Sequence, residues 1–273
     1  MPDVLSWLWD NREWIKEKLG SLAFWVREPN ERPILILGPG GCGKSTLLRM
    51  LTGQRDWLCE KPWEYKESVT QECLSDDSDV EFVAVPGQPH HQKPYWEALK
   101  QEIATGKYRG IIFLTAYGYH TIGKGIQIKN HRLYVTGVKH PTAAFLARYL
   151  PDRRADELRV LRLLVPSLSV CDQKMWFLTV VAKEDLWTDE HGAVETHYRT
   201  GDYGAEIANL VAAKNAATFR HELAFASLVI NNFMTAGGEL LKKNHEGYDH
   251  KAQVESVRGL VELVGGFKDW ESE

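Results

Sequence analysis

The 273-residue sequence has only 4 cysteines, and these lie far apart in the chain (Cys42, Cys59, Cys73 and Cys171). There is no CxxC pair, and neither the cysteines nor the 10 histidines show the spacing of metal ligands. The pattern argues against a disulfide framework and against a metal cluster. We therefore expect reduced thiols in a cytoplasmic protein.

Long apolar runs and an excess of positive charge are missing as well. No segment reaches the roughly 18 apolar residues of a membrane span. The first residues carry acids and no cationic leader, so we expect neither a transmembrane helix nor a secretion signal. The net charge of −4 argues against non-specific nucleic-acid binding, which needs a basic surface. The remaining class is a globular protein of ordinary composition that can bury a full core.

The first segment is expected to form a helix of its own. Apolar residues recur at helical spacing from residue 4 to residue 26, with tryptophans at the edge of the stripe. We divide the chain into an N-terminal amphipathic helix over residues 1–30 and a main domain over residues 31–273. The helix could pack on its own domain, or it could dock on a protein partner or a membrane surface.

The main domain opens with the pattern GxxxxGK[ST], in the stretch GPGGCGKST. The pattern joins the apolar run PILILG, an expected buried strand, to STLLRMLTG, an expected helix. Glycines let backbone N–H groups converge on phosphate oxygens, the lysine neutralises the β- and γ-phosphates, and the serine hydroxyl ligates Mg²⁺. We predict a nucleotide-binding loop that comprises Gly38, Gly40, Gly41, Cys42, Gly43, Lys44, Ser45 and Thr46. Within it, Cys42 is either a small side chain at a permissive position or a redox switch.

Two later apolar runs end in residues that fit the same class of site. The run EFVAV is followed by Pro-Gly-Gln, which contributes Gly87 and Gln88, and the run MWFLTVVA is followed by Lys183 and Asp185. At these residues the chain resembles the Ras-like P-loop GTPases, which carry GxxxxGK[ST], a switch threonine, DxxGQ and [NT]KxD in this order. The resemblance covers about residues 32 to 265. It agrees with the alternation of expected strands and helices, which predicts an α/β fold with a mostly parallel sheet and helices on both faces.

The resemblance implies a role for each matching residue. Asp185 would bind the guanine base, because a carboxylate can accept from both N1–H and N2–H₂ and adenine offers no such donor pair. Lys183 would lie along the base and tie its loop to the phosphate loop. The Gly87 amide would sense the γ-phosphate, and Gln88 would orient the attacking water with Lys44 as the second catalytic residue. Ser227, after an apolar run, is a weaker match to the last family motif.

The metal site is expected to use hydroxyl groups. Ser45 would ligate Mg²⁺ together with Thr70, the candidate switch threonine, for which Ser68 is an alternative. An ordinary strand-edge threonine is an equally good interpretation of Thr70. The spacing to the next motif leaves room for a short hairpin that turns at SDDSD.

The sequence departs from the family at the first residue of DxxGQ, where Ala84 replaces the aspartate. In the family this aspartate binds a water ligand of Mg²⁺. One possibility is that an acid upstream on the same strand takes its place, with Asp79 and Glu81 as candidates. The other is that Mg²⁺ is bound by the hydroxyls of Ser45 and Thr70 and by the phosphates. A second departure is Ala182, which replaces the first residue of [NT]KxD.

These observations favour a protein that binds GTP or GDP with Mg²⁺ and hydrolyses GTP slowly as a molecular switch. The two alanines motivate a second hypothesis, a GTP-binding scaffold that does not hydrolyse. A third is an ATP-dependent enzyme, for which the only candidate lid is the arginine-containing stretch at 151–159. A protein partner is expected at the N-terminal helix or at the switch loops.

The rest of the chain predicts further elements. His90 and His91 are expected in a mobile, exposed switch loop, with positioning of water as an alternative. Residues 119–140 exceed what a minimal domain needs and are interpreted as an insertion, with enough alternation for a hairpin. We expect a strand at 110–118 and helices at 95–106, 156–165, 203–216 and 249–267.

Overall fold

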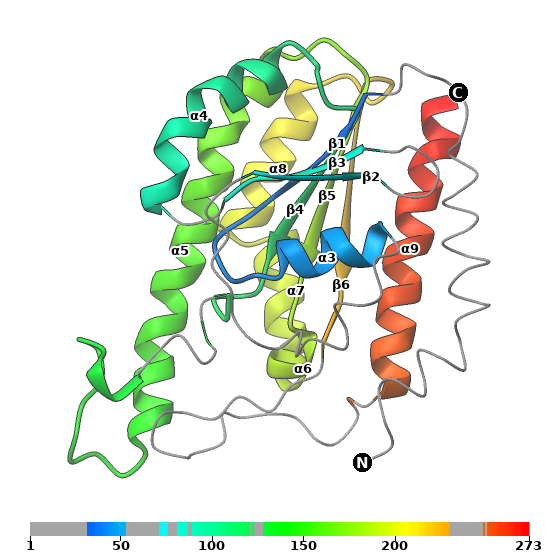
Figure 1. Ribbon diagram of the computed structural model, residues 1–273. Helices are drawn as coiled ribbons and strands as arrows, with labels where there is room; N and C mark the ends of the chain where they lie inside the picture. The colour runs from blue at the N-terminus through cyan, green and yellow to red at the C-terminus, as the bar shows by residue number, and fades with distance from the viewer. Residues whose placement is uncertain are drawn as a thin grey trace.

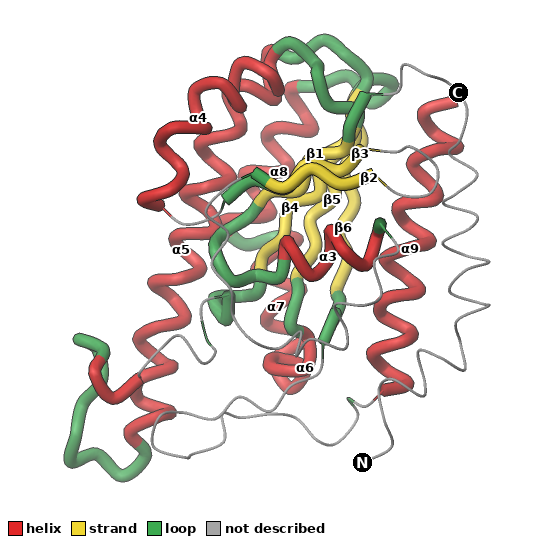
Figure 2. The backbone as a smooth tube through the Cα atoms, in the orientation of Figure 1, coloured by secondary structure: helices red, strands yellow, loops and turns green. Residues whose placement is uncertain are grey.

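The computed structural model describes residues 32–52, 71–75, 81–86, 89–120, 122, 128–229, 248 and 250–272. In this part of the chain a six-stranded sheet is covered by helices on both faces (Figures 1 and 2). The predicted α/β class with a mostly parallel sheet is confirmed. The proposed N-terminal helix lies outside the described residues, so the division at residue 31 stays a prediction.

The strands follow the order β2-β3-β1-β4-β5-β6 across the sheet. All pairs are parallel except β2 with β3, which is antiparallel. The predicted pairing of the chain on either side of SDDSD is thereby confirmed. The strands are β1 Ile34–Leu37, β2 Glu72–Ser75, β3 Glu81–Ala84, β4 Gly110–Thr115, β5 Met175–Val181 and β6 Phe219–Phe225.

Helices connect the parallel strands, as parallel pairing requires. The described helices are α3 Lys44–Leu51, α4 Pro89–Ala104, α5 Pro141–Val170, α6 Glu184–Trp187, α7 His191–Arg199, α8 Asp202–Ala213 and α9 His250–Ser272. Two short 3₁₀ segments, Ile128–Asn130 and Thr188–Glu190, complete them. In Figure 1, α3 and α9 lie on one side of the sheet, and α4, α5 and α8 lie on the other.

Neighbouring residues of β5 show how the two faces are covered. Because successive strand residues point to opposite faces, Trp176 and Phe177 must pack on different layers. Trp176 stacks on Phe267 of α9 with ring centroids 4.5 Å apart. Phe177 stacks on Phe113 of β4, which in turn meets Tyr203 of α8. The near-continuous apolar runs of β4 and β5 are explained by this burial on both faces.

Two helices begin earlier than the sequence predicted. The helix expected from residue 95 begins at Pro89, where a proline fits because the first helical position needs no N–H donor. His90 and His91 therefore lie in the first turn of α4, and the prediction that they lie in a loop is wrong. The helix expected from residue 156 runs from Pro141 and continues through Pro151.

The stretch at 151–159 consequently lies inside a helix, and its arginines are engaged there. Arg153 pairs with Asp152 and Asp156, and the Arg154 guanidinium lies 4.3 Å from the centre of the Tyr117 ring. A side chain held by such contacts does not have the mobility of a lid. This arrangement gives no support to the hypothesis of an ATP-dependent enzyme.

The predicted hairpin within 119–140 is not found in the described residues of that range. They contain one 3₁₀ turn and no strand. Two aromatic side chains of this range instead pack on the start of α5: Tyr134 lies against Phe145, and His131 meets Phe145 and Tyr149 edge-on. In the described part of the chain, no helix is long and apolar enough to cross a membrane.

Candidate nucleotide site

The candidate site lies at the edge of the sheet where the parallel strands end. The loops after β1, β4, β5 and β6 all leave the sheet at this edge, because parallel strands share a direction. Open α/β sheets bind ligands outside the carboxyl ends of their strands. The structure thus brings together the phosphate loop, Lys183, Asp185 and Ser227, which the sequence placed at the ends of separate apolar runs.

The phosphate loop has a backbone that only glycine adopts easily. Gly38, Gly41 and Gly43 all have positive φ, and Gly43 ends the loop as the N-cap of α3. A Cβ added at Gly38 would lie 2.1 Å from the carbonyl oxygen of Leu114 on β4. The loop therefore curls tightly against the sheet and aims the first turn of α3 outward, as anion binding at a helix start requires.

The lysine of the motif points into the loop. The Lys44 ammonium is buried and donates hydrogen bonds to the carbonyl oxygens of Gly38 at 3.0 Å and Pro39 at 2.9 Å. Burial lowers its pKa, against the opposing effects of Cys42 and Glu72. A buried ammonium that donates to neutral carbonyl oxygens is suited to an incoming polyphosphate, which would supply full negative charge.

The neighbouring serine faces an acid that the sequence analysis did not consider. Ser45 Oγ donates a hydrogen bond to Oε1 of Glu72, on β2, over 3.1 Å. A hydroxyl and a carboxylate are hard oxygen ligands, the kind that Mg²⁺ takes alongside substrate phosphates. These residues therefore fit the metal that the phosphate loop implies. The described residues contain no group of three or more His, Cys, Asp or Glu that could hold a metal by themselves.

The side of the site that is predicted to bind the base, here called the base side, is centred on Asp185. Asp185 lies in α6 and is 1 % exposed, and its Oδ1 accepts a hydrogen bond of 2.6 Å from the Ser227 hydroxyl. These residues are 42 positions apart in the sequence and are joined because β5 and β6 are neighbours. The geometry gives weight to Ser227, whose sequence match was the weakest, because the serine now fixes the orientation of the carboxylate.

Lys183 is held by the loop that follows β4. Its backbone is left-handed, with φ of 60°, and its ammonium donates to the carbonyl oxygens of Tyr119 at 2.8 Å, His120 at 3.1 Å and Ile122 at 3.3 Å. Desolvation lowers the pKa of Lys183 to about 8, and Cys42 and Asp185 act in the opposite direction. The hydrogen bonds described for this ammonium thus tie the base side to residues 119–122. A direct tie to the phosphate loop stays a prediction, although Cys42 is near enough to act on the charge.

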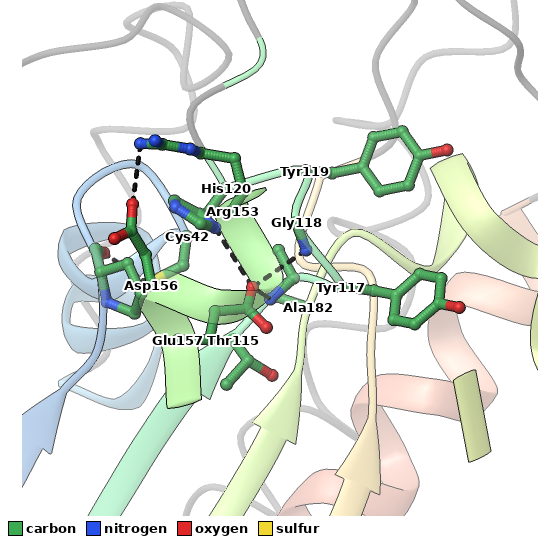
Figure 3. A network of polar contacts seen from close by, with 12 residues as sticks. Cys42, Thr115, Tyr117, Gly118, Tyr119, His120, Arg153, Asp156, Glu157 and Ala182 are labelled. Carbon is green, nitrogen blue, oxygen red and sulfur yellow. Dashed lines mark hydrogen bonds and ion pairs between the residues drawn. The ribbon is translucent and has the colours of Figure 1, made fainter. Parts of the chain in front are cut away.

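The buried acid Glu157 stabilises the loop that follows β4. Glu157 of α5 is fully buried, and its Oε1 accepts from the amides of Ala116 and Gly118, both at 3.0 Å, and lies 3.1 Å from His120 Nδ1 (Figure 3). Its Oε2 accepts from the Tyr198 hydroxyl at 2.6 Å. Burial favours a raised pKa for Glu157, but these hydrogen bonds prevail and lower it. The sequence offered no signal for this role, because Glu157 is a single acid in a helical pattern.

The loop around Ser227 is secured by α9 and the residues before it. Gln253 donates to the carbonyl oxygen of Leu228 at 3.0 Å, and the Ser227 amide donates to Ser256 Oγ at 3.3 Å. A Cβ added at Gly43 would lie 3.6 Å from Leu228 Cδ1, so this loop also touches the phosphate loop. The phosphate side and the base side are therefore in contact through Leu228.

The redox hypothesis for Cys42 is not favoured by its surroundings. The thiol is 1 % exposed and donates to the carbonyl oxygen of Pro39 at 3.0 Å. Burial raises its pKa, with Lys44 and Lys183 acting against that shift. A buried thiol with a raised pKa is a poor nucleophile, so Cys42 acts as a small side chain that fills the loop.

Three of the predicted site residues lie outside the described residues. They are Thr70, Gly87 and Gln88, and their roles stay predictions. Ala84 is described: it is buried at the end of β3 and pairs with Ile36 on one side and Glu72 on the other. The missing acid thus leaves an apolar position in the middle of the site.

No protein-family model and no curated protein sequence matches the chain. Among solved structures, it is similar to the ADP-ribosylation factor-like GTP-binding protein, small COPII coat GTPase SAR1, of Encephalitozoon cuniculi in complex with GDP, with 10 % identity over 83 % of this chain and 81 % of that chain and a TM-score of 0.41. It is also similar to the signal recognition particle receptor SRb–GDP of Chaetomium thermophilum, with 14 % identity over 75 % of this chain and 93 % of that chain and a TM-score of 0.37. At these identities the likeness is one of fold alone. The strand order and the glycine-rich loop between β1 and α3 are those of an α/β fold with a mostly parallel sheet and a phosphate-binding loop.

Proposed function

We propose that the protein binds GTP and GDP with Mg²⁺ and hydrolyses GTP slowly, as a molecular switch in the cytoplasm. The observation that carries the proposal is the buried pair of Asp185 and Ser227 beside the phosphate loop. The serine hydroxyl occupies one carboxylate oxygen and fixes the plane of the group. A carboxylate held in this way is suited to the adjacent N1–H and N2–H₂ donors of guanine and finds no such pair on adenine.

On the phosphate side, Lys44 neutralises the β- and γ-phosphates and Ser45 provides an oxygen ligand for Mg²⁺. The backbone amides of Gly38, Gly40, Gly41, Cys42, Gly43 and Thr46 complete the cradle. The metal, when bound, neutralises charge that develops on the phosphates. The contribution of the chain is to hold these groups in place before the nucleotide arrives, which reduces the cost of ordering them.

Hydrolysis is assigned to residues that come before β2 and after β3 in the chain. Gln88 orients the attacking water, the Gly87 amide senses the γ-phosphate, and Thr70 closes over the metal. Such sites turn over slowly on their own, and an arginine from a partner can add roughly 10³- to 10⁵-fold in rate. A protein partner that binds the switch loops or the N-terminal helix would therefore set the lifetime of the GTP state.

The second candidate function is a GTP-binding scaffold without hydrolysis. It is favoured by Ala84, which is buried where the family motif has an acid. Release of phosphate from GTP by the purified full chain separates the two functions. We expect slow turnover by the wild type and at least a tenfold lower rate for Gln88→Ala, whereas an unchanged rate in Gln88→Ala would remove the catalytic assignment.

Base selectivity tests the proposal most directly. We expect the full chain to bind GDP with far higher affinity than ADP, and Asp185→Asn to lose about 30- to 100-fold in GDP affinity, as the loss of a charged hydrogen-bond acceptor predicts. Fluorescent-nucleotide titration gives both constants. The exposed Asp189, in the 3₁₀ segment after α6, provides the matched control Asp189→Asn, which should bind as the wild type does. Equal affinity of the wild type for GDP and ADP would overturn guanine binding.

A further inference from the structure

The position of the missing acid lies opposite an acid on the neighbouring strand. In the antiparallel pair of β2 and β3, Ala84 is the direct partner of Glu72. Directly opposed residues of an antiparallel pair point to the same face of the sheet, with Cβ atoms about 4.5–5.5 Å apart. The side chain of Glu72 therefore leaves the sheet beside the methyl group of Ala84 and on the same face.

That face carries the start of α3. Glu72 extends far enough for its Oε1 to lie 3.1 Å from Ser45 Oγ, the hydroxyl that follows the lysine of the phosphate loop. The carboxylate also acts on the charge of the buried Lys44 ammonium. Glu72 is half-buried, whereas its neighbours Gln71 and Cys73 are exposed, as alternation along an edge strand predicts.

The acids considered from the sequence do not have this placement. Glu81 lies at the far end of β3, is exposed, and pairs with Ser75 rather than with the site end of β2. It is three positions from Ala84, so it points to the other face of the sheet. Asp79 lies outside the described residues. This placement gives no support to Glu81 as the acid that replaces the missing one.

We propose that Glu72 supplies the carboxylate of the Mg²⁺ site, in place of the acid that is absent at Ala84. The proposal rests on the proposed function, since the metal comes with the nucleotide. Ser45 and Glu72 then form a hydroxyl–carboxylate pair contributed by the phosphate loop and the edge strand. A longer side chain from the adjacent strand reaches the position that an acid at residue 84 would have occupied.

The test measures how strongly Mg²⁺ tightens nucleotide binding in the full chain. A fluorescent GDP analogue is titrated with Mg²⁺ and with EDTA, and Mn²⁺ binding to the GDP complex is followed by electron paramagnetic resonance. We expect Glu72→Gln to weaken Mg²⁺ and Mn²⁺ binding about 10- to 100-fold, as loss of a supporting group at a metal does, with GDP affinity in EDTA unchanged. The matched control Glu81→Gln, which alters an acid of the same hairpin, should bind metal as the wild type does.

A rescue separates a metal role from a structural one. The double variant Glu72→Ala with Ala84→Asp should regain most of the Mg²⁺ dependence that Glu72→Ala alone loses. If the wild type binds GDP with Mg²⁺ dependence and Glu72→Gln keeps it, the assignment of Glu72 is overturned and GTP binding stands. If the wild type binds no guanine nucleotide, the proposed function is overturned and the role of Glu72 falls with it.

Discussion

The lysine and the cysteine of the phosphate loop form hydrogen bonds within their own loop, whereas Lys183 and Asp185 are held by residues far apart in the chain. The hydrogen bonds of Lys44 and Cys42 reach carbonyl oxygens at most 6 positions away. Those of Ser227 and Lys183 span 42 and up to 64 positions. The hydrogen bonds of Lys44 and Cys42 are therefore local, although the loop also packs on Leu114 and Leu228, and the side with Lys183 and Asp185 depends on the packing of the sheet and of α5 and α9.

This difference indicates which half of the site tolerates change. The backbone conformation of the phosphate loop depends first on its own glycines, so we expect the loop to keep its shape as long as these residues are kept. A base side assembled over long range can vary in its supporting residues, and here the left-handed Lys183 relies on the loop after β4, which in turn relies on Glu157. Substitutions at Glu157 and its partners are thus expected to affect the side with Lys183 and Asp185 more than the phosphate loop.

The largest expected effect comes from Glu157→Ala, which removes the support of the loop after β4. Two backbone amides, the Tyr198 hydroxyl and His120 would lose a buried acceptor. We expect the free energy of unfolding to fall by about 3–5 kcal/mol in urea denaturation at pH 7. The control Glu195→Ala removes an exposed ion pair with Arg199 and should cost about 0.5 kcal/mol or less.

The same acid predicts a dependence on pH. Burial acts to raise the pKa of Glu157, but the hydrogen bonds from His120 and Tyr198 outweigh it and the folded pKa is lowered from 4.5. The stabilisation is fully present above that ordinary pKa and is lost as the pH falls through the lower folded pKa. Glu157→Gln lacks this ionisation, so its stability should decline less steeply below pH 4.5 than that of the wild type. Parallel acid-denaturation curves would contradict the role assigned to the carboxylate.

The next largest effect is expected at the phosphate loop. Gly38→Ala forces a Cβ to within 2.1 Å of the Leu114 carbonyl oxygen at a φ of 138°. We expect a loss of about 2–4 kcal/mol in the free energy of unfolding, together with loss of GDP binding. Gly137→Ala is the matched control, because its φ is also positive but no atom lies within 4 Å, and it should cost only about 1 kcal/mol. Normal GDP affinity in Gly38→Ala would show that the loop is less constrained than its contacts suggest.

The smallest effect comes from a single contact on the base side. Ser227→Ala removes the hydrogen bond to Asp185 and leaves the carboxylate without its orienting hydroxyl. We expect a loss of about 1–2 kcal/mol in stability and a roughly tenfold lower GDP affinity, measured by fluorescence titration. Thr200→Ala, which removes an exposed hydroxyl contact in a helix end, should change neither quantity. Equal losses in the two variants would remove Ser227 from the site.

The fold class and the phosphate loop could be predicted because their signals are local. The motif lies within one strand–loop–helix unit, and buried parallel strands appear as short apolar runs. The lengths of α4 and α5 could not be predicted in this way. Proline usually marks the end of a helix, yet Pro89 begins α4, and α5 continues through Pro151.

The supporting residues of the site were invisible for a different reason. Glu157 and Glu72 each reach the site through a contact between elements, one from α5 and one from the register of β2 on β3. Nothing near either residue in the sequence distinguishes it from an ordinary surface acid. The antiparallel pairing of β2 could be expected, but the opposition of Glu72 and Ala84 required the register itself.

The attachment of α9 determines when the base side can form as the protein is made. The Ser227 amide donates to Ser256 Oγ and the Leu228 carbonyl oxygen accepts from Gln253, and both residues of α9 are synthesised later than every described strand. The loop that carries Ser227, whose hydroxyl orients the Asp185 carboxylate, is therefore completed only when α9 docks. The purine selection proposed for Asp185 would then appear late in the folding of the newly made chain.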